Sequence, residues 1–200
     1  MQIGPNTSTL IDGWLEAGRG SDTALITADD QPWTANELYR AVCNVAARFD
    51  DAGIGREDRV LLVLDDTPAF PAVFLGAMRI GAIPVPVNFL ARPDDFGYFL
   101  DDSQATTAVV DHAFLEEVGP QVAARPDVKL VVANGATNGA ESLDEWMASD
   151  AGEVSPVSSQ ADDMAFWMYS SGSTGPPKSG VHRHSSVAAT WARYAVPALG

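Results

Sequence analysis

Cysteine and lysine are both scarce in this chain of 200 residues. With a single cysteine, Cys43, no internal disulfide can form, which fits a reducing compartment and predicts a cytoplasmic location. Cys43 lies in the helical pattern ELYRAVCNVAARF without a recognisable catalytic partner, so we interpret it as a packed side chain rather than a nucleophile. The two lysines are Lys129 and Lys178, and the second follows a loop rich in glycine and hydroxyl groups.

Basic side chains are outnumbered, because 12 Lys and Arg stand against 27 Asp and Glu, for a formal net charge of −15. A surface of this sign repels phosphate backbones and anionic lipids, which excludes nucleic acid and membrane surfaces as expected partners. The most apolar stretch, FPAVFLGAMRIGAIPVPVNFLA, contains Arg79 and prolines and is interpreted as a buried helix followed by a buried strand. No basic start followed by an apolar run opens the sequence, so a secretory signal is not expected.

Acidic residues are absent from Met164 to Gly200. The first 163 residues have 9 basic and 27 acidic side chains, a net charge of −18, whereas the last 37 have three basic side chains and a net charge of +3. A segment cleared of acids leaves room for a bound anion. A buried strand and helix that lack charged residues would give the same asymmetry, so charge alone leaves both interpretations open.

Apolar runs alternate with amphipathic segments, which predicts an α/β fold with a mainly parallel sheet flanked by helices. Thr34 and Glu37 form a capping-box pattern at the start of one helix, and Thr67 with Pro68 is expected to cap and open another. The prolines of IPVPV indicate an irregular or edge strand. Strands are expected near 59–64, 83–87, 106–111, 128–132, 164–169 and 180–184, and helices near 35–53, 68–81, 93–102, 112–118, 143–147 and after a cap at Ser185.

The stretch SSGSTGPPK lies between two expected strands. Ligands collect at the carboxyl ends of strands in open α/β sheets, and glycines allow backbone N–H groups to approach them closely. Hydroxyl donors and one lysine suit a polyphosphate. A solvated Ser/Gly linker is the alternative interpretation, although such a linker would not be expected between two buried strands.

A Walker A loop, G-x-x-x-x-G-K-[ST], is the nearest general phosphate motif, and GSTGPPKS places Lys178 and Ser179 correctly. Pro177 stands at the second glycine and has no N–H to offer a phosphate. The segment after the loop, GVHRH, also indicates a strand rather than a helix. A P-loop NTPase is therefore disfavoured.

The stretch YSSGSTGPPKSGVHRH resembles the phosphate-binding signature of the adenylate-forming (AMP-binding) enzymes. Its Tyr-Ser-Ser start and H-x-H end, together with the run from DRVLLVLDD to TTAVV, are most similar to the benzoate- and hydroxybenzoate-CoA ligase branch. The resemblance implies that residues 1–200 are an incomplete N-terminal portion of the large, AMP-binding domain, with a phosphate loop at 169–182. It implies ATP phosphate contacts from Ser170, Ser171, Gly172, Ser173, Thr174, Gly175 and Lys178.

The resemblance also implies a reaction: a carboxylate attacks the α-phosphorus of Mg-ATP, and the thiol of coenzyme A then displaces AMP from the acyl-adenylate. ATP, Mg²⁺, coenzyme A and an aromatic or other small carboxylic acid are the expected partners, with Ser170 or Thr174 as a contact to Mg²⁺. We expect no catalytic residue within this chain, because the segments that hold adenine, ribose and the acid in the family lie beyond it. An inactive protein that binds a nucleotide or a partner is the alternative.

Two features depart from the family pattern or extend it. Ser179 stands where the family has glycine after the lysine, and if that position needs a positive φ the loop is strained, unless Gly180 relieves it. His182 and His184 are expected on one face of a short strand, near the nucleotide. An H-x-H pair can chelate a metal, but without a recognisable third ligand no metal site is predicted.

Overall fold

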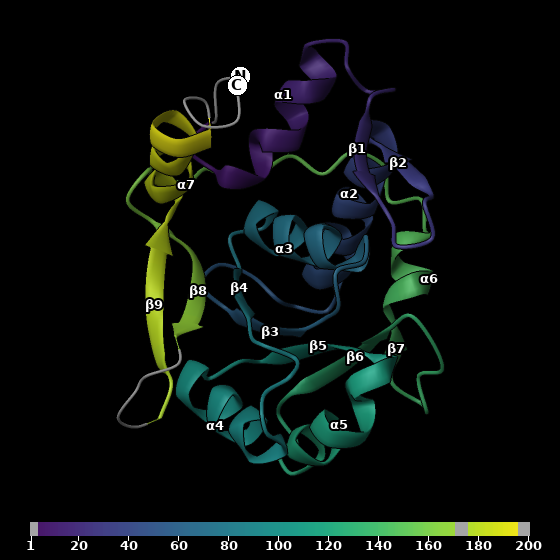
Figure 1. Cartoon of the computed structure of the whole chain (residues 1–200), viewed down its shortest axis with the longest axis vertical. Coiled ribbons are helices and arrows are strands. Elements are labelled where there is room, and N and C mark those ends of the chain that lie inside the picture. The colour runs from purple at the N-terminus through teal and green to yellow at the C-terminus, as the bar shows by residue number, and fades with distance from the viewer. Residues whose placement is uncertain (1–3, 171–175, 196–200) are drawn as a thin grey trace.

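A five-stranded parallel sheet forms the centre of the molecule (Figure 1). The computed structural model describes residues 4–170 and 176–195. Strand order is β4-β3-β5-β6-β7, with every neighbouring pair parallel. The expected α/β architecture with a mainly parallel sheet is confirmed. The strands are β3 (Arg59–Val63), β4 (Ile83–Pro86), β5 (Thr107–Asp111), β6 (Lys129–Ala133) and β7 (Glu141–Ser142).

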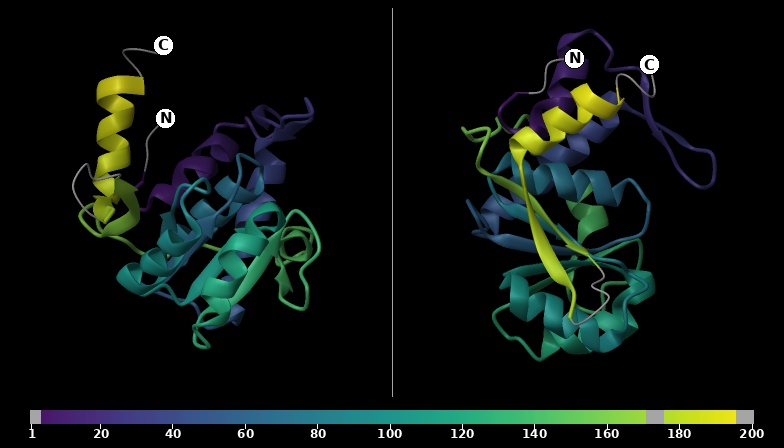
Figure 2. Two further views of the ribbon diagram at one scale, coloured as in Figure 1. Left: turned by 60° about the horizontal axis from the view of Figure 1, so that its bottom comes forward. Right: turned by 60° about the vertical axis from the view of Figure 1, so that its left-hand side comes forward.

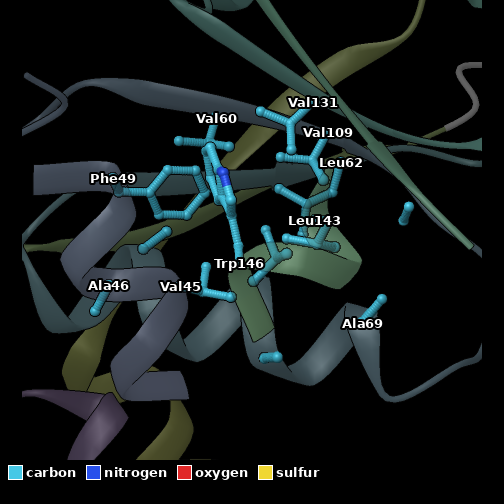
Figure 3. Close-up of a cluster of buried hydrophobic side chains, with 14 of the residues drawn as sticks. Val45, Ala46, Phe49, Val60, Leu62, Ala69, Val109, Val131, Leu143 and Trp146 are labelled. Atoms are coloured by element: carbon cyan, nitrogen blue, oxygen red, sulfur yellow. The ribbon is translucent and has the colours of Figure 1, made fainter. Parts of the chain in front are cut away.

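Helices cover both faces of this sheet (Figure 1). On one face lie α2 (Ala35–Asp51), α3 (Ala69–Arg79) and α6 (Leu143–Met147), and on the other lie α4 (Pro93–Ser103) and α5 (Leu115–Ala123), which follows the short turn η2 (His112–Phe114). Alternate residues of the strands enter the two cores, since Val60 and Leu62 join the first and Leu61 and Val63 the second. Figure 3 shows the first core, where the Phe49 and Trp146 rings meet edge to face at 5.5 Å.

The helix α2 follows the sequence pattern closely. Thr34 accepts a hydrogen bond from the Glu37 backbone, and the Glu37 carboxylate accepts one from the Thr34 backbone, so the capping box is formed. The apolar positions at helical spacing are all buried: Leu38, Val42, Val45, Ala46 and Phe49. Cys43 is buried beside them, as the packing interpretation expects.

An N-terminal segment packs on α3 through a buried ion pair. It comprises η1 (Thr7–Thr9), α1 (Leu10–Glu16) and the small antiparallel ribbon of β1 (Thr23–Ile26) and β2 (Pro32–Thr34). Both guanidinium nitrogens of Arg79 donate to the Asp12 carboxylate, at 2.8 and 2.7 Å. The Arg79 side chain is 1% exposed, so this pair fixes α1 against the body of the domain.

The edge strand β4 explains where the sheet stops. Ile83 and Val87 donate their backbone N–H groups toward β3, to Asp58 and Leu62, so the positions between them, Pro84 and Pro86, face the outer edge. Proline has no N–H, so these two positions offer no backbone donor to a further strand. The edge position predicted for IPVPV is confirmed by the strand order.

Beside that edge lies a separate antiparallel hairpin of β8 (Met164–Ser170) and β9 (Lys178–Arg183), followed by α7 (His184–Thr190) and a π-helical turn, η3 (Trp191–Ala195). The right-hand view of Figure 2 shows the hairpin running along the side of the domain. Partly buried side chains of β8, Met164, Trp167 and Tyr169, pack on the second core. The hairpin therefore joins the domain through side-chain packing.

Two helix starts differ from the sequence-based expectation. Pro68, not Thr67, is the N-cap of α3, and the Thr67 hydroxyl accepts from the Asn134 amide at 3.3 Å. The last helix begins at His184 with Arg183 as its N-cap, and the Ser186 hydroxyl accepts from the Arg183 backbone, so Ser185 is not the cap. No helix in the described ranges is long and apolar enough to cross a membrane.

Candidate ATP site on the hairpin

The end of the hairpin places Lys178 and Ser170 opposite each other. They form the last pair of the β8–β9 ladder, and residues 171–177 connect the two strands. The Ser170 hydroxyl donates to the Lys178 carbonyl oxygen at 3.4 Å, and the Lys178 side chain is on an exposed position. Five of the predicted phosphate contacts, Ser171 to Gly175, lie outside the described residues, so their role stays a prediction.

The hairpin corrects one premise of the sequence analysis. The loop was expected to follow a strand of the parallel sheet and to lie between two buried strands. Within the described part of the chain, β8 pairs with β9, and β9 is exposed over most of its length. The prolines at the edge of β4 supply no N–H donors to β8, which disfavours pairing between β8 and the sheet.

The backbone at Ser179 removes the strain that the missing glycine suggested. Ser179 lies inside β9, and its φ is not positive, so the position does not require glycine. Gly180 does not relieve backbone strain either, because its φ is also not positive. An added Cβ at Gly180 would meet only the Met168 carbonyl oxygen, at an ordinary contact distance of 3.6 Å. Serine is therefore compatible with this strand.

The helix α4 supplies neighbours that the sequence analysis missed. Tyr98 donates its hydroxyl to the Pro177 carbonyl oxygen at 2.9 Å, and the Tyr169 hydroxyl donates to the Asp102 carboxylate at 2.6 Å. The Phe99 and Tyr169 ring centroids are 4.7 Å apart. No signal in the sequence pairs these residues, because the two hydrogen bonds join positions 79 and 67 residues apart.

Charge around the hairpin differs from the charge of its own sequence. Although no acid follows Asp163, Asp102 enters from α4, and Asp162 forms an ion pair with Arg183 at 3.1 Å. Burial first, and then the hydrogen bond to Asp102, raise the pKa of the Tyr169 hydroxyl above its ordinary value, so Tyr169 remains a donor at neutral pH. Carboxylates from earlier parts of the chain therefore lie beside the segment that has no acidic residues of its own.

His182 lies on β9, whereas His184 lies just beyond the strand, which ends at Arg183, so the expectation of two histidines on one strand is wrong. His182 stacks on Phe166, with ring centroids 4.5 Å apart and planes 3° from parallel. It lines an apolar groove of about 310 Å³. His184 instead begins α7, is 4% exposed, and accepts from the Thr7 backbone N–H at 3.0 Å. A position near the nucleotide stays a prediction for both.

A grouping of three or more His, Cys, Asp or Glu side chains fit to hold a metal ion is not present among residues 4–170 and 176–195. The hydroxyl of Ser170, at the end of β8, is a weak metal ligand by itself. Mg²⁺ commonly retains several waters and binds through substrate phosphates rather than an all-protein cage. The contact of Ser170 or Thr174 with Mg²⁺ therefore stays a prediction.

Residues 14–198 match the family described as AMP-binding enzyme, and the chain belongs to that family. It is 40% identical over 194 residues to the benzoate–CoA ligase of Thauera aromatica, covering 96% of this chain and 36% of that protein. It is 34% identical over 170 residues to the 3-hydroxybenzoate–CoA ligase of Aromatoleum sp. (strain CIB), covering 84% and 32%. The chain thus spans about a third of the length of these relatives.

Solved structures show the same fold. A benzoate CoA ligase from Burkholderia xenovorans LB400 superposes with a TM-score of 0.86 at 31% identity, over 98% of this chain and 38% of that one. The anthranilate CoA ligase AuaEII, in complex with anthranoyl-AMP, superposes with a TM-score of 0.90 at 26% identity, over 98% and 38%. The architecture is therefore that of the N-terminal region of these ligases.

Proposed function

We propose that this chain is the N-terminal part of an ATP-dependent aryl-acid CoA ligase of the benzoate type, and that its hairpin holds the ATP phosphates. The observation that carries the proposal is the 40% identity to a benzoate–CoA ligase over 96% of the chain, which includes the hairpin. Lys178 is exposed and lies in the last pair of that hairpin, which supports a contact with phosphate.

The chemistry assigned to these residues is electrostatic. A carboxylate attacks the α-phosphorus of ATP, the bond to the β-phosphate oxygen breaks, and pyrophosphate leaves. The ammonium group of Lys178 offsets the negative charge that develops on the leaving phosphates, and hydroxyl and N–H groups of residues 170–175 donate to their oxygens. The thiol of coenzyme A then displaces AMP to give the thioester. In this scheme the chain binds and orients ATP, and no residue of it attacks or transfers a proton.

The substrate class rests on the relatives. Three relatives, at 34% to 40% identity, act on benzoate or hydroxybenzoates by name, and the structural relative AuaEII holds anthranoyl-AMP. We therefore assign an aromatic carboxylic acid rather than a fatty acid, although a long-chain-fatty-acid–CoA ligase of Mycobacterium tuberculosis also matches at 33% identity. ATP, Mg²⁺ carried by ATP, and coenzyme A are the other partners.

A P-loop NTPase fits the structure less well. In that class the lysine precedes a helix whose N-terminus binds the phosphates. Here Lys178 is the first residue of β9, so no helix N-terminus faces the loop from that side. An inactive nucleotide-binding protein would keep the hairpin without producing a thioester.

The test uses the product of the complete reading frame that encodes this chain. It is incubated with ATP, Mg²⁺, coenzyme A and one acid at a time: benzoate, 3-hydroxybenzoate, 4-hydroxybenzoate or palmitate. We expect thioester and AMP with the aromatic acids and a far lower rate with palmitate. Binding of ATP without any thioester would favour the inactive alternative, and a preference for palmitate would refute the aromatic assignment.

A further inference from the structure

The helix α4 contacts both strands of the hairpin from one of its faces. Tyr98 and Asp102 are four residues apart, the spacing that places two side chains one above the other on a helix. Tyr98 donates to Pro177, next to β9, and Asp102 accepts from Tyr169, on β8. One helix face thus holds the hairpin at two points, beside the end where β8 finishes and β9 begins (Figure 1).

Both contacts converge on the backbone of Lys178. Pro177 directly precedes Lys178, and Ser179, which directly follows it, is the cross-strand partner of Tyr169. The Tyr169 ring is further held by its contact with Phe99 at 4.7 Å. The residues on either side of Lys178 are therefore connected to α4, whereas the Lys178 side chain extends from that point on an exposed position.

Backbone support for this end of the hairpin is limited in the described part of the chain, although side chains of β8 pack on the second core. The edge of β4 lacks the N–H groups that would pair with β8, and β9 is exposed over most of its length. A two-stranded ribbon has little stability without packing against other elements. The hydrogen bonds from α4 are thus well placed to decide where Lys178 lies.

The helix is itself anchored on its other side. Arg125, just after α5, pairs with Asp101 at 2.6 and 2.7 Å and donates to the Gly97 carbonyl oxygen at 3.0 Å. Asp101 and Asp102 are adjacent in sequence but contact different partners, the first in the body of the domain and the second in the hairpin. This pair of carboxylates provides a matched control.

We propose that Tyr98 and Asp102 are positioning residues of the ATP site, which hold the backbone of Lys178 in place before the nucleotide binds. This inference rests on the proposed function for its consequence in catalysis, though not for the contact itself. A lysine that is already in position spares ATP the entropic cost of ordering the hairpin, so loss of either contact should weaken ATP binding without changing the affinity for the acid.

The first test is hydrogen exchange in the product of the complete reading frame, without nucleotide. The variants are Tyr98→Phe, Asp102→Ala and the control Asp101→Ala. Exchange in the peptide covering 176–183 should rise roughly two- to tenfold in Tyr98→Phe and roughly tenfold or more in Asp102→Ala, reflecting one neutral and one charged hydrogen bond. Asp101→Ala should leave this peptide unchanged.

The second test separates positioning from simple stability. KM for ATP should rise by similar factors in Tyr98→Phe and Asp102→Ala, while KM for benzoate and the values of Asp101→Ala stay near wild type. Asp102→Asn keeps an oxygen that accepts from Tyr169 and should restore most of the loss. If the wild type has no ligase activity, the proposed function fails, and the exchange experiment still decides the contact.

Two results would overturn the inference. One is exchange in 176–183 that is equal in Asp102→Ala, Tyr98→Phe and Asp101→Ala. The other is faster hydrogen exchange in 176–183 together with an unchanged KM for ATP. That result would show that the contact stabilises the hairpin without affecting ATP binding. If Asp102→Ala does not fold, Tyr98→Phe decides alone, because it removes one oxygen atom and no packing surface.

Discussion

Ser179 occupies the position after the lysine where the family signature has glycine. In the structure it is an ordinary strand residue, so its effect on the backbone is small. We predict that Ser179→Gly keeps the rate of ATP–pyrophosphate exchange and lowers the free energy of unfolding by about 0.5–1 kcal/mol, the cost of glycine in a strand. Thermal unfolding and the exchange assay measure the two effects. A clear loss of rate would show that the serine hydroxyl itself contributes to the site.

His184 gives a prediction at the same scale for the dependence of stability on pH. Burial lowers the pKa of His184 below its ordinary value, with Asp163 opposing this shift and Arg56 adding to it. The unfolded chain therefore binds the proton more readily, so stability is full above about pH 6.5 and falls as pH drops toward the folded pKa.

Replacing the imidazole ring of His184 tests whether this residue causes the loss of stability at low pH. His184→Asn keeps an oxygen that can accept from the Thr7 N–H but cannot titrate, so the loss of stability as pH falls below about 6.5 should become smaller. Chemical denaturation of the wild type and the variant at a series of pH values measures this slope, and an unchanged slope in His184→Asn would contradict the assignment.

At the scale of elements, the buried pair of Arg79 and Asp12 holds the N-terminal segment on α3. Asp12→Ala leaves the guanidinium of Arg79 buried without its carboxylate, and removing one partner of a buried pair costs about 3–5 kcal/mol. Because Asp12 is 22% exposed, we predict a loss near 3 kcal/mol in urea unfolding. Asp22→Ala, which breaks the exposed pair with Arg19, should cost under about 1 kcal/mol. Equal effects would contradict the role of burial.

The elements that the sequence predicted well are those governed by local pattern. The capping box and helical spacing gave α2, the buried apolar runs gave β3, β5 and β6, and the prolines gave the edge position of β4. Two helix starts were predicted one or two residues away from where they lie. At α3 the Thr67 hydroxyl contacts the distant Asn134, and at α7 the Ser186 hydroxyl, rather than Ser185, accepts from the N-cap backbone.

The candidate site was predicted in the same partial way. Lys178 and the hydroxyl residues belong to a local sequence signature, so they could be identified from the sequence. Their position on a hairpin beside the sheet could not be predicted from that signature. Tyr98 and Asp102 were missed because their contacts with Pro177 and Tyr169 depend on how α4 packs against β8, which no local pattern encodes.

At the scale of the molecule, the 200-residue chain spans about a third of its relatives, and apolar side chains are exposed on the hairpin and the helix that follows it. Examples are Met168 at 49%, Val181 at 51% and Tyr194 at 64% exposure. We predict that residues 1–200 expressed alone form no benzoyl-CoA and self-associate, since exposed apolar surface favours association. Sedimentation and a thioester assay measure this. A monodisperse chain that makes benzoyl-CoA would contradict it.

The most direct measurement of the central claim is benzoate-dependent ATP–pyrophosphate exchange by the product of the complete reading frame. It compares the wild type with Lys178→Ala and with Lys129→Ala, which removes the other lysine, an exposed residue that contacts the Ala52 carbonyl oxygen. Losing one charge-assisted contact costs about 1.5–3 kcal/mol, roughly ten- to over a hundredfold in affinity for ATP. The account predicts this loss in Lys178→Ala and near wild-type exchange in Lys129→Ala. Equal exchange in the two variants would contradict it.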